Sequence, residues 1–236
     1  MMALPKLDTP TYRLTLPSTR EEIQYRPFLV KEQKLLMMAQ ESESDEEIVD
    51  AISSLVKTCT FDKIDPENSP MFDIEYIFLQ IRGKSVGEKI QLQIVCPDDE
   101  QTRVDIELDI NDISVQMTSD HTNEIKITDT VKLFLKYPIL KDMKGLVDNS
   151  SGVEQIFSLL THCVQEIHYD EQIFNRIDIS DKDINEFIDQ LTTEQFEGIS
   201  KFFDTMPKLR HVIPVKNPKT QVESEVVVEG LASFLE

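Results

Sequence analysis

The sequence predicts an α+β fold with a helical N-terminal part, a small antiparallel sheet in the middle, and a helical C-terminal part that ends in a β-hairpin. Two changes in hydrophobic periodicity indicate this order. The spacing is helical up to about residue 84, alternates over about 88–136, and is helical again from 153. The strongest helix signal has apolar residues at the i, i+3, i+4, i+7 positions of one face: Ile74, Ile77, Phe78 and Ile81.

The stretch Pro70–Glu88 contains these residues and is expected to form a central helix over about 70–84. A further apolar face beside the first leaves little of the circumference for solvent, so the helix should pack on at least two sides. Two helices are expected before it, over residues 30–59. They follow an extended, Pro-rich arm over residues 1–29, in which Tyr12–Leu16 should form a short strand.

The middle and C-terminal segments complete the predicted organisation. Residues 30–148 should form one region of helices and sheet, in which Lys89–Val95 and Arg103–Ile110 form a hairpin. Residues 149–236 should form a helical region, beginning with a helix at Val153–Ile167 and ending in a zinc-ribbon-like hairpin without zinc ligands.

Composition limits the possible functions. The 236 residues include 24 Lys and Arg against 44 Asp and Glu, for a net charge of −20. Phosphate backbones and anionic membranes repel such a chain, so neither nucleic acid nor membrane is an expected partner. Cys59, Cys96 and Cys163 lie far apart, which favours a reducing compartment over a disulfide framework. The N-terminus lacks the apolar region of a signal peptide.

Two similar turns resemble the turns of a zinc site. CPDD and NPKT each lie between predicted strands, as zinc knuckles do, but a knuckle needs cysteines at both ends of its turn. Only Cys96 is present, and the other three positions hold Asp99, Asn217 and Thr220. No zinc and no other cofactor is therefore expected. The carboxylates of the middle strands lack an accompanying histidine, nucleophile or phosphate loop, so no enzyme activity is expected either.

Three segments resemble the T-even-type (T-four-like) bacteriophage baseplate hub and baseplate assembly proteins. They are Tyr12–Ala39, Phe72–Glu88, and the C-terminal MPKLRHVIPV with EGLASFLE. With the spacing of the middle strands, they cover nearly the whole chain. The resemblance implies contractile-tail morphogenesis, assembly in the bacterial host cytoplasm, a place in the tail baseplate of the virion, and no catalysis. Members often carry Cys-Pro-x-Cys turns, from which CPDD and NPKT depart.

Two functions within this family remain open on sequence alone. The first is a structural baseplate hub subunit or hub assembly factor that acts through contacts with other hub or tape-measure proteins. The second is a tail assembly chaperone of those proteins that is absent from the mature virion. A carboxylate-based hydrolase is a third alternative, disfavoured because the sequence lacks a nucleophile or metal constellation.

The resemblance also suggests partner-binding residues at the arm and at the end of the central helix. They are polar residues expected at the surface: Tyr25, Arg26, Lys31, Arg82, Lys84 and Ser85. Arginine and aromatic side chains are common anchors of protein contacts, and a local group of cations is unusual in so acidic a chain. The alternative is that these cations pair with nearby carboxylates such as Glu32 and Asp73.

Overall fold

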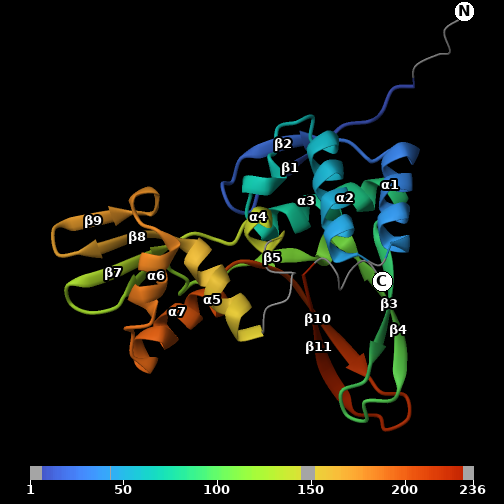
Figure 1. Cartoon of the computed structure of the whole chain (residues 1–236). Coiled ribbons are helices and arrows are strands. Elements are labelled where there is room, and N and C mark those ends of the chain that lie inside the picture. The colour runs from blue at the N-terminus through green and yellow to red at the C-terminus, as the bar shows by residue number, and fades with distance from the viewer. Residues whose placement is uncertain (1–6, 43, 145–151, 231–236) are drawn as a thin grey trace, which may run out of the picture. The chain divides into compact units, whose positions relative to one another are not determined.

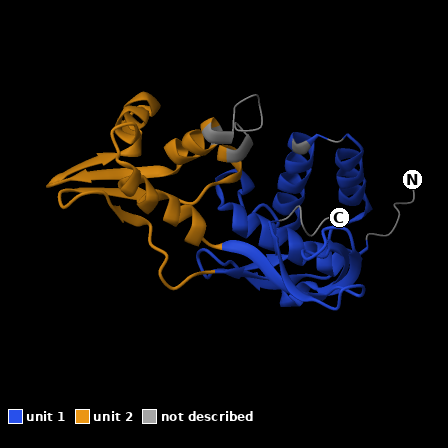
Figure 2. Ribbon diagram, turned by 90° about the horizontal axis from the view of Figure 1, so that it is seen from below, with its two compact units in different colours: residues 1–116, 208–236 blue, residues 117–207 orange. Residues whose placement is uncertain are grey.

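The structure is a computed structural model that describes residues 7–42, 44–144 and 152–230. The segment boundary expected between residues 148 and 149 lies outside the described residues. The chain divides into two compact units, which Figure 2 colours separately. Unit 1 comprises residues 1–116 and 208–236, and unit 2 comprises residues 117–207. Both ends of the chain therefore contribute to unit 1.

The helices of unit 1 confirm the sequence prediction for this part. They are α1 (Val30–Glu41), α2 (Asp45–Cys59) and α3 (Met71–Val86) (Figure 1). The Ser44 hydroxyl accepts a hydrogen bond from the Glu47 N–H and so caps α2. The arm contains β1 (Tyr12–Thr15) and a strand that was not predicted, β2 (Glu22–Tyr25), which pairs antiparallel with it. Its apolar side chains pack with α2 and α3 in one hydrophobic cluster.

Unit 1 contains two further sheets. The predicted hairpin of β3 (Lys89–Val95) and β4 (Arg103–Asp109) is confirmed as a separate two-stranded sheet. The second sheet has the order β11-β10-β5, formed by Glu223–Glu229, Lys208–Lys216 and Ser114–Gln116 respectively. Leu79 of α3 and the inner faces of these sheets share a second hydrophobic cluster. The central helix thus packs on two sides, as its sequence indicates.

Unit 2 consists of an antiparallel sheet and helices. The sheet has the order β6-β7-β8-β9, formed by Glu124–Lys126, Val131–Leu135, Val164–Tyr169 and Gln172–Asn175. The helices are α4 (Leu140–Lys144), α5 (Gly152–Cys163), α6 (Asp181–Ile188) and α7 (Thr193–Thr205). Ser180 and Thr192 form capping boxes at α6 and α7. Ile184, Ile199 and Phe202 join the inner face of the sheet in a third cluster.

The predicted fold arrangement is wrong in two respects. The helix expected at Val153–Ile167 ends at Cys163, and the next six residues form strand β8, so the C-terminal part is not a helical region ending in a hairpin. The strands between 88 and 136 do not form one sheet either. They belong to three sheets, because β5 pairs with β10 and β7 pairs with β8.

Short 3-10 helices complete the described elements. They are η1 (Pro66–Asn68), η2 (Ile110–Asp112) and η3 (Arg176–Asp178). None of the helices in the described ranges is both long enough and apolar enough to cross a membrane.

Candidate partner-binding site

The structure gathers the six predicted partner-binding residues in unit 1, where the arm meets α1 and α3. The expectation that they lie at the surface is wrong for Tyr25, which is 2% exposed and belongs to the hydrophobic core. Its burial raises the pKa of the phenol to about 12. The Tyr25 ring lies 5.7 Å from the Tyr12 ring across the β1–β2 pair. Tyr25 therefore joins the arm to the core of the unit.

Arg26 also stabilises this junction. Its Nη2 lies 3.0 Å from Glu32 Oε1, and its Nη1 donates to the Pro27 carbonyl at 2.9 Å. Glu32 Oε2 accepts the Leu29 N–H at 2.7 Å, at the start of α1. Burial raises the pKa of Glu32, but the hydrogen bonds from Arg26, Leu29 and Lys31 outweigh it and hold the pKa below its ordinary value. This cation is thus paired with a carboxylate, as the alternative interpretation expected.

The remaining polar residues of the group also have partners inside the unit. The Ser85 hydroxyl accepts the Phe28 N–H at 2.9 Å and donates to the Ile81 carbonyl at 2.6 Å. Lys84 forms an ion pair with Glu88 and lies over the Tyr12 ring, with Nζ 5.3 Å from its centroid. Lys31 is the most exposed of the three, although its Nζ lies 3.2 Å from Glu32 Oε1.

Arg82 differs from these residues. Among the described residues no hydrogen-bond partner reaches its Nη1 atom, which is buried. Burial lowers the pKa of the guanidinium, as expected for a cation removed from water without a compensating anion. An unsatisfied buried donor is costly, so a carboxylate placed here by a partner would gain an interaction that the isolated chain lacks.

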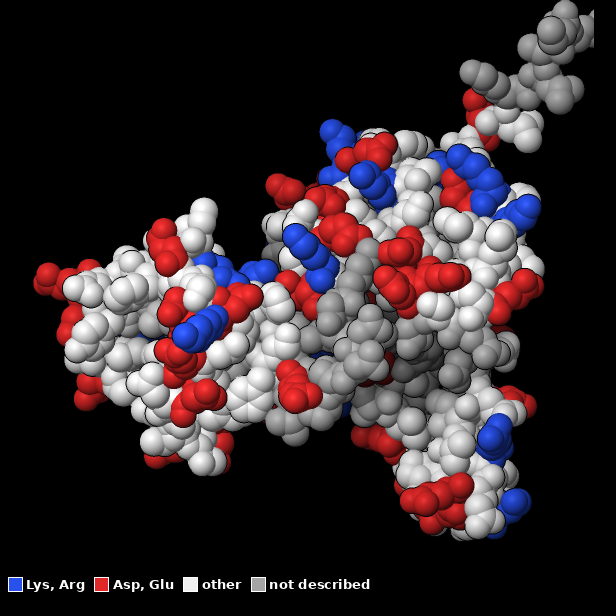
Figure 3. Space-filling view, in the orientation of Figure 1, with Lys and Arg blue, Asp and Glu red and all other residues white. Residues whose placement is uncertain are grey.

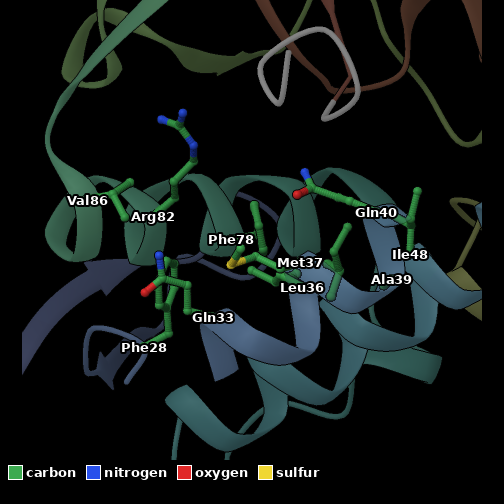
Figure 4. Close-up of a pocket in the computed structure, with 11 residues that line it drawn as sticks. Phe28, Gln33, Leu36, Met37, Ala39, Gln40, Ile48, Phe78, Arg82 and Val86 are labelled. Carbon is green, nitrogen blue, oxygen red and sulfur yellow. The ribbon is translucent and has the colours of Figure 1, made fainter. Parts of the chain in front are cut away.

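Arg82 lies at the edge of a groove between α1 and α3, with a volume of about 200 Å³. The Arg82 groove is lined by apolar and uncharged side chains apart from Arg82: Phe28, Gln33, Leu36, Met37, Ala39, Gln40, Ile48, Ile52, Phe78 and Val86. Figure 4 shows Phe78, Arg82 and Val86 on α3 and Gln33, Leu36 and Met37 on α1. The guanidinium points away from Phe28 and Gln33, so the stem of Arg82 borders the groove.

The sequence indicated Arg82 as a partner-binding residue but gave no indication of the groove beside it. Met37 is 54% exposed and Val86 is also exposed, although each lies in an apolar stretch that predicts core packing. One signal was available: α1 carries several apolar residues on more than one face, which is more than a helix packed on one side requires.

The two knuckle-like turns lie side by side in unit 1 and share a backbone geometry. Glu100 N–H bonds to the Cys96 carbonyl and Gln221 N–H to the Asn217 carbonyl, each at 2.9 Å, and both donors have positive φ. Asn217 Nδ2 donates to Asp98 Oδ1 at 3.0 Å, and the Thr220 hydroxyl donates to the same carboxylate. The hydrogen bond from Thr220, followed by that from Asn217, holds the pKa of Asp98 below its ordinary value.

The residues at the four knuckle positions do not suit zinc. Burial raises the pKa of the Cys96 thiol, and Asn217 and Thr220 offer a neutral amide and a hydroxyl in place of thiolates. Asp99 accepts hydrogen bonds from the Thr102 hydroxyl and N–H, which lower its pKa. Direct hydrogen bonds between side chains therefore join the two turns. Within the described ranges no group of three His, Cys, Asp or Glu residues is arranged to hold a metal ion.

An open groove lined by apolar side chains is typical of a protein-binding surface. The described residues thus form a mixed helix-and-sheet protein that carries one candidate contact surface of this kind in unit 1. Comparison with known families then identifies it more closely. A family model described as T4 bacteriophage base plate protein matches residues 9–236, nearly the whole chain. The chain belongs to this family, which confirms the resemblance found in the sequence.

The family is one of bacteriophage baseplate proteins, which is consistent with a structural role in the baseplate. The chain has no match among curated proteins and none among solved structures.

Proposed function

We propose that this baseplate protein is a non-enzymatic hub subunit or hub assembly factor that binds another hub or tape-measure protein through the Arg82 groove. The observation that carries the proposal is the unpaired, buried Nη1 of Arg82 beside an exposed apolar surface. The partner segment should present apolar side chains to Met37 and Val86 and a carboxylate to Arg82.

Two adjacent methionines provide a matched test of the groove. Met37 lines the groove and is 54% exposed, whereas Met38 is 58% exposed and does not line it. An aspartate at either position keeps its charge in water and should leave the fold intact. Met37→Asp places a carboxylate against an apolar partner surface, so baseplate assembly and recovery of the partner should fall at least tenfold.

Both variants would be supplied to a phage whose own copy of the gene is inactivated, and assembled baseplates would be counted. Met38→Asp should behave as the natural protein. Wild-type assembly with Met37→Asp would show that the groove is not the contact surface. Equal loss with both variants would point to a general defect of α1 and would equally contradict the proposal.

The alternative proposal is a tail assembly chaperone that is absent from the mature virion. The acidic character of the chain suits a soluble holder of apolar helices: Figure 3 shows Asp and Glu side chains distributed over the visible face of both units. Mass spectrometry of purified virions distinguishes the two. Near-stoichiometric amounts of this chain would support a hub subunit, and its absence together with Met37-dependent assembly would support a factor that leaves.

A further inference from the structure

Strand β9 is an exposed edge of the four-stranded sheet in unit 2. Its sequence, QIFN, contains no charged residue and no proline. Ile173 is 56% exposed, and Phe174 is 42% exposed. Natural proteins usually protect sheet edges with charges, prolines or bulges, because an unpaired edge can add another strand.

Two other edge strands in the described sheets carry charged residues. At the opposite edge of the same sheet, β6 contains Glu124 and Lys126. In unit 1 the edge strand β11 has glutamates at three of its seven positions. Strand β5 is uncharged, but its one apolar residue, Val115, packs in the core. Edge β9 therefore lacks a protection that the same chain uses elsewhere.

The hydrogen-bond phase of the sheet shows which backbone groups of β9 face outward. The Asp170 N–H donates to the Thr130 carbonyl at 2.9 Å, toward β7, so its neighbour Tyr169 must direct its backbone groups toward β9. Tyr169 is opposite Gln172, which makes these two residues the hydrogen-bonded pair that closes the hairpin. The next residue, Ile173, and then Asn175 direct their N–H and C=O groups away from the sheet.

The side chains on the two faces of β9 would also gain contacts from an added strand. Phe174 lies opposite Ile167 of β8, which is buried in the core of unit 2, so Phe174 extends the core face of the sheet. Ile173 lies opposite His168, whose ring is 4.4 Å from the Phe134 ring on the other face. An added strand with apolar residues on both faces would cover both exposed side chains.

Acidic residues border β9 at both ends. Asp170 and Glu171 form the turn before it, and Asp178 follows it, all exposed. The nearby cation Arg176 is already paired with Asp181. A second copy of this chain would bring the same carboxylates and another net charge of −20 to the edge, whereas lysine or arginine would be attracted there.

We infer that β9 is a strand-addition site for an extended segment of another protein, with apolar residues at alternate positions and basic residues at its ends. The site lies in unit 2, and the inference does not depend on the Arg82 groove of unit 1. Main-chain hydrogen bonds to Ile173 and Asn175 would provide the register, and the basic ends would provide the preference for this edge.

The test uses the full-length protein and a synthetic peptide, Lys-Lys-Val-Thr-Val-Thr-Val-Lys-Lys, as the probe. Amide hydrogen exchange followed by NMR should slow at least tenfold at Ile173 and Asn175 in saturating peptide, because these N–H groups acquire acceptors. Exchange at Phe174 should change little, since its N–H already bonds to β8. A peptide with glutamates in place of the lysines should bind at least tenfold more weakly.

Variants distinguish a loss of peptide binding at β9 from a loss of folding. Ile173→Pro removes an outward N–H and should weaken peptide binding at least tenfold without loss of the β8 ladder. Ile173→Lys should do the same by charge, while Val227→Lys on edge β11, where Val227 is 43% exposed, should bind as the natural protein does. If Ile173→Pro unfolds, Ile173→Lys decides alone.

Unchanged exchange at Ile173 and Asn175 in millimolar peptide would overturn the inference. So would equal peptide binding by the natural protein and Ile173→Lys. Slow exchange at these amides without peptide, together with a dimer in sedimentation, would assign the edge to a second copy and would also overturn it. None of these outcomes alters the test of the Arg82 groove.

Discussion

Truncation of Phe78 tests whether α3 is the central packing element of unit 1. Phe78 is 2% exposed and lies in the same hydrophobic cluster as Cys59. An aromatic side chain buries roughly 150–250 Å², worth about 4–6 kcal/mol at 25 cal/mol per Å². Alanine retains part of this area, and measured Phe→Ala losses are roughly 3–5 kcal/mol. Because Phe78 borders the Arg82 groove, its neighbours can partly close the cavity, so we expect about 3 kcal/mol for Phe78→Ala.

Cysteine labelling measures this loss separately in each unit. Burial raises the pKa of the Cys59 thiol to about 11 and that of Cys163, in unit 2, to about 12, so neither should react with a thiol reagent in the folded state. A loss of about 3 kcal/mol raises the open population, and hence the Cys59 labelling rate, on the order of 100-fold. Mass spectrometry of the labelled peptides identifies each site.

The reciprocal variant is the control. Phe202 is 1% exposed in the core of unit 2, so Phe202→Ala should accelerate labelling of Cys163 and leave that of Cys59 unchanged. A rise at Cys59 below about fivefold in Phe78→Ala, equivalent to about 1 kcal/mol, would refute the packing argument. Equal acceleration at both cysteines would show that the two cores do not open separately.

Two further predictions concern charge and metal. Glu32 has a folded-state pKa below its ordinary value of 4.5, so its contribution to the free energy of unfolding is present above pH 4.5 and is lost as pH falls through the folded pKa. Glu32→Gln should therefore destabilise the protein by roughly 1.5–3 kcal/mol at pH 7. In urea unfolding series, the difference in free energy of unfolding between the natural protein and the variant should shrink below pH 4.5. A difference that stays constant with pH would contradict the pairing of Glu32 with Arg26. Protein purified without a metal-binding tag should contain no zinc by elemental analysis, and one zinc per chain would show that the knuckle-like turns bind metal despite their residues.

The sequence by itself determined the elements whose signals are local. The 3.6-residue periodicity predicted α1, α2 and α3. Alternation on both sides of a polar turn predicted β3 and β4. In each case the hydrophobic periodicity, the cap or turn residues and the pattern of burial agree within one short segment. The residues of that segment are therefore sufficient to predict the element.

Tertiary structure decided the pairings and the boundary between α5 and β8. VQEIHY continues the apolar pattern of the preceding helix and also alternates as a strand does, and only the pairing of Leu133 with Ile167 selects the strand. Val115 pairs with Leu209 across more than ninety residues, a contact to which no local pattern refers. The candidate site also depends on tertiary structure. The sequence shows Arg26 and Arg82 only as two cations. In the folded protein Arg26 pairs with a carboxylate, whereas Nη1 of Arg82 has no partner among the described residues.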